Sequence, residues 1–345
     1  MKTQILGSLF ATAAAFALVA APSGANADEI TMATWGGSFG KAFQKHWTGP
    51  FEAATGTKVN LIFGGSATNK QKVAAEQASP KIDVLTMVTG DAIDAYQRGL
   101  TVALDKGKIP NLSQLRDLAI KKGDDGGILG AGLWVTALGI AYRTDKVTWD
   151  MKKWTDLSDS RLKNKVGLPS PKYSNAHFVW WSNQLAGGSP QDISMGMKWL
   201  KGLGTNVILE FDGSVQVLKQ MAQGEIWAAP MLDVTASRIK GVPYRFFVPA
   251  EGGSAGVDVI AQVKNSPNPA GAMKFINFII DSKPAGAICG ELKVKCVNKN
   301  AKASGSLVSD ADVDRLMPPP EAIINAKKGE WLETWAKEIT PLSKR

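Results

Sequence analysis

The chain has 345 residues, of which 21% are charged and 44% are hydrophobic, a composition that excludes an intrinsically disordered protein. Its formal net charge of +9 comes from scattered lysines and arginines. Without an arginine-rich run or a basic–aromatic ladder, this charge argues against a nucleic-acid-binding surface. The length exceeds that of a usual single hydrophobic core, so two lobes are expected.

Residues 1–27 have the pattern of a secretory signal peptide. An apolar, alanine-rich run extends to Ala21, and Ala25-Asn26-Ala27 forms a cleavage signature. The run is too short for a membrane anchor, and no later segment reaches the roughly 18 apolar residues of a spanning helix. We therefore expect a soluble mature protein that begins at Asp28 and works in the periplasm.

The first third of the mature chain alternates strand-like and helix-like segments. Strands are predicted over Ile30–Thr34, Val59–Phe63 and Ile82–Val88, each followed by a helix, the first of which is amphipathic. This β-α-β-α-β order predicts parallel strands joined by right-handed crossovers, and therefore an α/β fold.

Each of these three predicted strands ends in glycine and a small polar residue. In open α/β sheets, ligands lie at the carboxyl ends of the strands, where glycine lets backbone N–H groups approach them. Trp35 would add a flat apolar wall. Alternatively, the glycines only make tight turns and Trp35 belongs to the core. The candidate ligand contacts at these strand ends are Trp35, Gly36, Gly37, Ser38, Ser66, Thr89 and Asp91.

A long β-like run, Leu133–Tyr142, is predicted to leave the first lobe, and Val257–Val263 to cross back. The cleft between two such lobes is where small ligands bind and where hinge closure acts. We predict lobe one at 28–137 plus 259–307 and lobe two at 138–258 plus 308–345. Further strands are predicted at 166–168, 207–211, 226–231 and 245–248, and further helices at 189–203, 215–223, 233–241, 268–282 and 318–337.

The chain has two cysteines, Cys289 and Cys296. They are close in sequence, and such a pair usually forms a disulfide in an oxidising compartment.

One motif suggests an enzyme. Residues 252–256 match the G-x-S-x-G pattern of serine hydrolases, with Ser254 as the nucleophile. A nucleophile elbow needs a following helix, whereas a β-like segment follows here. We therefore expect a protein that is not an enzyme and that uses no cofactor or metal.

An ordered set of motifs resembles the extracellular solute-binding proteins of bacterial ABC importers, especially the spermidine/putrescine-binding branch. The motifs are TWGG at 34–37, PFEAATGTKV at 50–59, DVLT at 83–86, ALGIAYRTDKV at 137–147, GEIWAAP at 224–230, PAEGG at 249–253, VDVIAQV at 257–263, NPAGAMKFINFII at 268–280 and KKGEW at 327–331. The resemblance implies a two-lobed periplasmic binding fold of type II, a monomer, and a permease partner in the inner membrane.

The resemblance also implies a polyamine site made of an aromatic box and carboxylates, and the chain departs from it. Trp35 and Asp258 match the family pattern. The family carries acidic or aromatic residues at several positions where this chain has Gly36-Gly37-Ser38, Gly256, Leu232 and Val294. Two further acidic residues of the family are replaced here by residues 170–175. The sequence also argues against an iron-binding site, because the four tyrosines include no adjacent pair.

The remaining candidates suit a small amine-bearing or zwitterionic solute. Asp258, Asp91 and Asp233 are candidate partners of an ammonium group, although Asp91 and Asp233 could instead cap helices. Lys172, the strand-end N–H groups and Ser38 or Ser66 are candidate partners of a carboxylate or phosphonate, and Tyr173 is a further candidate ligand contact. An organic-anion carrier is therefore the alternative within this class of binding protein.

Overall fold

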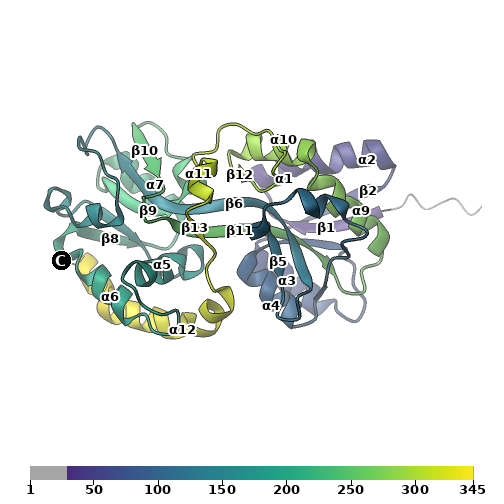
Figure 1. Ribbon diagram of the computed structural model, residues 1–345, viewed down its shortest axis with the longest axis horizontal. Coiled ribbons are helices and arrows are strands. Elements are labelled where there is room, and N and C mark those ends of the chain that lie inside the picture. The colour runs from purple at the N-terminus through teal and green to yellow at the C-terminus, as the bar shows by residue number, and fades with distance from the viewer. Residues whose placement is uncertain (1–28, 345) are drawn as a thin grey trace, which may run out of the picture.

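The structure is a computed structural model of the chain and describes residues 29–344. It has two α/β halves, joined by the long antiparallel strands β6 (Ile128–Arg143) and β11 (Gly253–Val263), as Figure 1 shows. The two-lobed α/β fold predicted from the sequence is confirmed. The predicted signal peptide lies outside the described residues.

The first half has the predicted parallel arrangement, with strand order β2-β1-β3-β11. Strand β11 runs antiparallel to β3 and places Asp258 beside Val88 at the end of β3. The strands of this half are β1 (Glu29–Thr34), β2 (Lys58–Phe63), β3 (Val84–Val88), β4 (Thr101–Val102) and β5 (Ile120–Lys122). Its first helices are α1 (Ser38–Phe43), α2 (Gly49–Thr55), α3 (Ser66–Ala75) and α4 (Thr89–Gln97).

Three aromatic residues spaced four apart anchor the first helical segment. Phe43, Trp47 and Phe51 are all buried, and the rings of Phe43 and Trp47 stack with centroids 4.7 Å apart. A π-helical turn over Gln44–Thr48 joins α1 to α2, and its wider turn keeps residues four apart on one face. Gly56 ends the segment with a left-handed φ of 73°, as helix C-termini commonly do.

The second half is built on the other end of β6. Ala137 is the last residue of β6 that pairs with β11, and Leu138 is the first that pairs with β9. The strands are β7 (Val166–Pro169), β8 (Val207–Phe211), β9 (Ala228–Leu232) and β10 (Tyr244–Phe247). The helices are α5 (His177–Leu185), α6 (Ser194–Lys201), α7 (Ser214–Gln223) and α8 (Asp233–Ala236).

Helix prediction failed in parts of this half. The helix predicted from Ser189 begins at Ser194, whose backbone N–H donates to Asp192 over 2.9 Å. The helix predicted from Asp233 to Gly241 ends at Ala236. Helix α5 was not predicted, and it buries Trp180 and Trp181 in the core.

The chain returns to the first half and then crosses once more. Helices α9 (Pro269–Ile279) and α10 (Ser282–Leu292) cover the first half, and a disulfide joins Cys289 of α10 to Cys296 of β12 (Lys295–Cys296). Helix α11 (Asp310–Val313) and β13 (Leu316–Met317) follow, and β13 pairs with β11.

The last helix, α12 (Glu321–Glu338), packs on the second half through Ile324, Trp331 and Trp335, while its first turn reaches α4 of the first half. Short 3₁₀ segments lie at Pro110–Gln114, Asp117–Ala119, Trp154–Ser158, Ser160–Leu162, Tyr173–Ala176, Gly204–Asn206 and Thr340–Lys344. Within residues 29–344, no helix combines the length and the apolar character that crossing a membrane requires.

Candidate ligand-binding cleft

A cavity of about 220 Å³ lies between the two halves, at the hinge strands. It is bounded by the β3–α4 turn, by β6 and β11, by the β9–α8 turn, and by the first residues of α5 and α12. Two of these positions, the β3–α4 and β9–α8 turns, lie at the carboxyl ends of strands, where α/β sheets bind ligands. The lining residues are Val88, Thr89, Thr136, Ser174, Asn175, His177, Leu232, Val234, Gly256, Val257, Asp258 and Glu321.

Asp258 of strand β11 contributes a carboxyl group to the lining of this cavity. It lies on β11 opposite Trp134 of β6, and the Trp134 Nε1–H donates to Asp258 Oδ2 over 2.7 Å. Desolvation raises the pKa of Asp258 to about 7, although the Trp134 hydrogen bond and the nearby His177 lower it. Within residues 29–344, no lysine or arginine forms an ion pair with Asp258. The site therefore holds a carboxyl group whose charged form lacks a compensating cation.

Aromatic rings pack against Trp134, the residue that donates to this carboxylate. Trp35, which follows β1, has its ring centroid 6.1 Å from that of Trp134, and Phe39 of α1 lies 6.0 Å from the same ring. Trp35 and Phe39 are only partly buried, so their rings remain partly accessible. None of these three rings lines the cavity, and Trp134 is 1% exposed, so its role at the site is to hold Asp258.

Asp233 is a second carboxyl group without a cation. It is 1% exposed, its Oδ1 accepts the backbone N–H of Ala137 over 2.9 Å, and its Oδ2 has no hydrogen-bond partner within residues 29–344. Desolvation raises the pKa of Asp233 to about 7, the Ala137 N–H lowers it, and the charge of Asp258 raises it further. Asp233 is the first residue of α8, where its own N–H and that of Val234 also lower the pKa of the carboxyl group. Its hydrogen bond with Ala137 ties β6 to the second half.

A polar cluster on the second half faces the first half across the cleft. We call Asn175, His177, Glu321, Asn325 and Lys328 the α12 cluster. Glu321 accepts from Asn175 Nδ2 over 2.8 Å and lies 2.9 Å from His177 Nε2, and Lys328 Nζ donates to Asn175 Oδ1 over 2.9 Å. Burial opposes the ionisation of Glu321, yet His177 and Asn175 keep its pKa below the ordinary value.

The backbone before α5 is strained where it enters this cluster. Ser174, Asn175 and Ala176 have left-handed φ values of 49°, 50° and 60°. Such values are uncommon outside glycine and cost free energy unless surrounding contacts hold them. Here Asn175 is held by Glu321 and Lys328, so the strain is localised at a wall of the cavity.

Gly90 is where the first half touches the α12 cluster. Asn325 Nδ2 donates to the Gly90 carbonyl over 3.0 Å. A Cβ atom at Gly90 would lie 2.8 Å from Glu321 Oε2 and 3.0 Å from Asn175 Nδ2, closer than real contacts allow. The two halves therefore approach this closely only because residue 90 has no side chain.

Some predicted contacts at the strand ends are engaged with each other. Asp91 accepts from Ser66 Oγ and from Lys70 Nζ, both over 2.6 Å, so its charge is already paired. Thr89 lines the cavity, and its Oγ1 donates to the Val257 carbonyl over 2.6 Å. Gly36, Gly37 and Ser38 follow β1 and do not line the cavity; Gly37 has a left-handed φ of 65°.

The predicted contacts of the second half point elsewhere. Lys172 is exposed and pairs with Asp212 at 3.1 Å. Tyr173 is buried, its hydroxyl contacts Thr235 Oγ1 at 2.8 Å and accepts the Leu232 N–H over 3.1 Å, and burial raises its pKa. Tyr173 thus stabilises the β9–α8 turn through these two contacts. Neither residue lines the cavity.

His177, Glu321 and Lys121 were not singled out from the sequence. His177 and Glu321 are 144 residues apart, and no local pattern connects them. Lys121 of β5 is partly buried, and within residues 29–344 its ammonium group has no hydrogen bond or ion pair. Burial lowers the pKa of Lys121, while the negative charge of Glu321 raises it.

The structure does not provide the family's aromatic box at two key positions. A side chain at Gly256 would collide with Thr136 Oγ1, so a tryptophan does not fit there without rearrangement. Leu232 contributes an aliphatic wall instead of a ring. Among residues 29–344, no group of three or more His, Cys, Asp or Glu side chains is arranged to hold a metal ion.

Ser254 lies inside strand β11, is fully buried, and has an unpartnered Oγ within the described part of the chain. The strand continues to Val263, so the strand–turn–helix geometry of a nucleophile elbow does not occur there.

Comparison with known proteins identifies a family and several similar proteins. A family model described as bacterial extracellular solute-binding protein matches residues 47–313. Iron uptake protein A1 of Synechocystis is 26% identical over 305 residues, covering 80% of this chain and 81% of that protein. Spermidine/putrescine-binding periplasmic protein 1 of Haemophilus influenzae is 24% identical over 289 residues, covering 81% of this chain and 78% of that protein.

A solved structure of an ABC transporter from Clostridium perfringens superposes with a TM-score of 0.79 and 23% identity, covering 90% of this chain and 99% of that one. The likeness shows a shared fold. The two curated relatives are named for different ligands, so kinship alone leaves the ligand of this cleft open.

Proposed function

The chain belongs to the bacterial extracellular solute-binding proteins, and we propose that it captures a small amine-containing or zwitterionic solute in the periplasm and delivers it to an ABC permease. The two halves close around the solute by bending at β6 and β11, and the solute is released unchanged. The protein works as a monomer, and its partner is the permease in the inner membrane.

The observation that carries this proposal is the uncompensated carboxyl group of Asp258. Asp258 keeps some exposed surface, yet the surrounding protein desolvates its carboxylate, and an unpaired desolvated charge responds by holding a proton near neutral pH. A ligand ammonium group would supply the missing charge. The Trp35 ring, which is partly accessible and lies 6.1 Å from Trp134, would add cation–π attraction only to a ligand that extends beyond the cavity to reach it.

The charges around the cavity support a cation more than an anion. Asp258 and Glu321 line it, together with His177, and no lysine or arginine of residues 29–344 does. Lys121 does not line the cavity, but its unpaired ammonium group interacts electrostatically with Glu321 and would attract a carboxylate on a ligand that extends toward β5. The alternative, a carrier of a simple organic anion, relied on Lys172, whose charge is already paired with Asp212.

A thermal-shift screen against amines, amino acids, opine-like compounds and phosphonates tests this proposal. A ligand at 100 times its Kd stabilises the folded state by about 2.7 kcal/mol, which is readily measured. Stabilisation by amines or amino acids supports the proposal. Stabilisation by phosphonates or simple carboxylates alone supports the alternative.

Binding of a cationic ligand should strengthen as the pH rises from 6 to 8. With a pKa of about 7 in the empty protein, Asp258 is mostly protonated at pH 6 and mostly ionised at pH 8. The ionised fraction therefore rises by roughly tenfold, and the affinity for a cation should rise with it. Calorimetric titration of a screening hit at several pH values measures this. A pH-independent affinity would contradict the role given to Asp258.

The same raised pKa makes a prediction for the empty protein. The folded carboxyl groups of Asp258 and Asp233 keep protons that the unfolded chain releases above a pKa of 3.8. Their contribution to the free energy of unfolding is therefore present at low pH and is lost as the pH rises through about 7. Saturating cationic ligand should reduce this loss.

Replacing Ser254 by alanine should leave ligand binding unchanged and should not alter the turnover of a generic ester. The Ser254 hydroxyl has no hydrogen-bond partner within residues 29–344, so its loss should change the free energy of unfolding by no more than about 1 kcal/mol. Ligand affinity and turnover of a generic ester are measured for both proteins. Ester turnover that disappears in the Ser254→Ala variant would instead support a hydrolase.

A further inference from the structure

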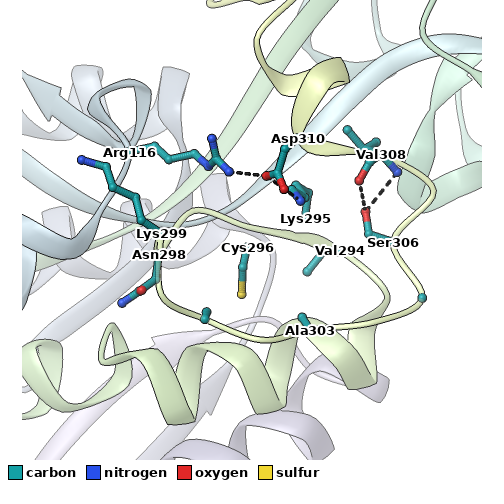
Figure 2. A pocket seen from close by; sticks show the side chains of 12 residues that line it. Arg116, Val294, Lys295, Cys296, Asn298, Lys299, Ala303, Ser306, Val308 and Asp310 are labelled. Atoms are coloured by element: carbon teal, nitrogen blue, oxygen red, sulfur yellow. Dashed lines mark hydrogen bonds and ion pairs between the residues drawn. The ribbon is translucent and has the colours of Figure 1, made fainter.

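A second cavity, of about 190 Å³, lies beside the disulfide (Figure 2). Figure 1 shows its elements, β12 and α11, on one side of the hinge strands, and α4 and α12 of the cleft on the other. Its walls come from Arg116, from residues 294–301 around β12, and from residues 303–310 leading into α11. The cavity is thus separate from the cleft.

The lining of this cavity has an excess of positive charge. Arg116, Lys295 and Lys299 are its cations, and Asp310 is its one anion. Asp310 is shared: Arg116 Nη2 contacts it directly, and Lys295 Nζ lies 2.8 Å from it (Figure 2). Within residues 29–344, Lys299 Nζ has no partner at all. Such a concentration of one charge sign attracts ions of the opposite sign.

Arg116 also has hydrogen-bonding capacity that the protein does not use. It contacts Asp310 through Nη2, while its Nε is buried and has no partner within the described chain. A buried N–H group without a partner is costly, and a guanidinium group is well shaped to bind an oxyanion through two of its N–H groups. An oxyanion in the pocket would offset the charge of the guanidinium group, and a small movement of the Arg116 side chain would bring the buried Nε–H within its reach.

The backbone that carries these cations is firmly held. Arg116 N–H donates to the Val297 carbonyl over 2.9 Å, and Lys299 N–H donates to the Gln114 carbonyl over 2.8 Å. Asn298 Nδ2 donates to Gln114 Oε1 and to the Ile280 carbonyl, over 2.9 and 2.7 Å. A site that is ordered before binding loses less conformational entropy when a ligand arrives.

We propose that this cavity, which we call the hinge-side pocket, binds a small oxyanion such as a phosphate or carboxylate group. Arg116 and Lys299 supply the free donors, and Lys295 shares its charge between the oxyanion and Asp310. The oxyanion is distinct from the solute carried in the cleft.

Calorimetric titration with inorganic phosphate, with sulfate and acetate as further arms and chloride holding the ionic strength constant, tests this proposal. We expect saturable phosphate binding that weakens by roughly tenfold in Arg116→Gln and in Lys299→Gln, because each removes a charge-assisted contact. Comparison of the arms shows whether the pocket prefers a phosphate-like or a carboxylate oxyanion. Lys299 is exposed, so its variant keeps the test valid if Arg116→Gln folds poorly.

Lys81→Gln is the matched control, since it removes one positive charge from an exposed position elsewhere in the first half. It should change phosphate affinity by less than about twofold, as expected for a distant charge at physiological salt. Absence of saturable binding, or equal weakening in Lys81→Gln, would overturn the proposal. Asp258→Asn should retain phosphate binding, so the result is independent of what the cleft binds.

Discussion

Replacing Asp258 by asparagine is expected to weaken the binding of a cationic ligand by roughly 30-fold to more than 1,000-fold, the effect of removing one partner of a desolvated charge pair. Asparagine has nearly the same shape, and its side-chain carbonyl can still accept the Trp134 N–H that now reaches Asp258 Oδ2. The variant therefore removes the charge and keeps the packing. Calorimetric titration with a hit from the amine and amino-acid screen measures the loss.

Asp150→Asn is the control for this variant. Asp150 is exposed in the second half and pairs with Arg245 and Lys152. The Asp150→Asn variant therefore removes one negative charge from a position outside the cavity lining. Its ligand affinity should equal that of the unmodified protein. Above pH 7 the empty Asp258→Asn protein should be no less stable than the unmodified one, because it no longer desolvates a charge. Undiminished affinity in Asp258→Asn would remove the basis for a cationic ligand.

Replacing Gly90 by leucine is expected to hold the two halves apart. The Cβ position at Gly90 is already within 3.0 Å of Glu321 and Asn175, and a leucine side chain must displace the α12 cluster to fit. Gly90 lies in α4, where leucine is a better helix former, so the first half itself should not be destabilised. Overpacking of this kind costs about 1–3 kcal/mol, which corresponds to a ligand affinity lower by roughly 5- to 150-fold.

Gly329→Leu is the matched control, because Gly329 is an exposed helical glycine of α12 with nothing within 4 Å of its Cβ position. Gly90→Ala should fall between the unmodified protein and Gly90→Leu. Affinity is measured by calorimetry, and the separation of the halves by small-angle scattering. A Gly90→Leu protein that binds and closes normally would show that the contact with the α12 cluster is not needed for closure.

Local sequence patterns were sufficient for the frame of the cleft. Strands β1, β2 and β3 follow alternating and β-branched runs, and Gly56 and Gly224 end helices in the left-handed conformation that glycine favours. The ordered motifs pointed to the family that the comparisons confirm. Trp35 and Asp258 were singled out because they match the family pattern, whereas the contact of Trp134 with both depends on the pairing of β6 with β11 and could not be read from the local sequence.

The remaining walls of the cleft depend on contacts between distant parts of the chain. His177 meets Glu321 only because α12 returns along the second half after a long excursion. Helix α5 escaped prediction because it begins after three left-handed residues, Ser174 to Ala176, none of them glycine. Asp233 looked like a helix cap, yet the β9–α8 turn points its carboxylate at Ala137 of the hinge. These outcomes are set by tertiary packing, which overrides local preference.

The central claim is that two halves close on an unaltered solute at the ends of their strands. Small-angle X-ray scattering of the unmodified protein, with and without a saturating ligand from the screen, tests it most directly. The account predicts a smaller radius of gyration with the ligand, no such change in Asp258→Asn, and recovery of the ligand intact from the same sample. An identical scattering profile with and without ligand, or conversion of the ligand to a product, would contradict it.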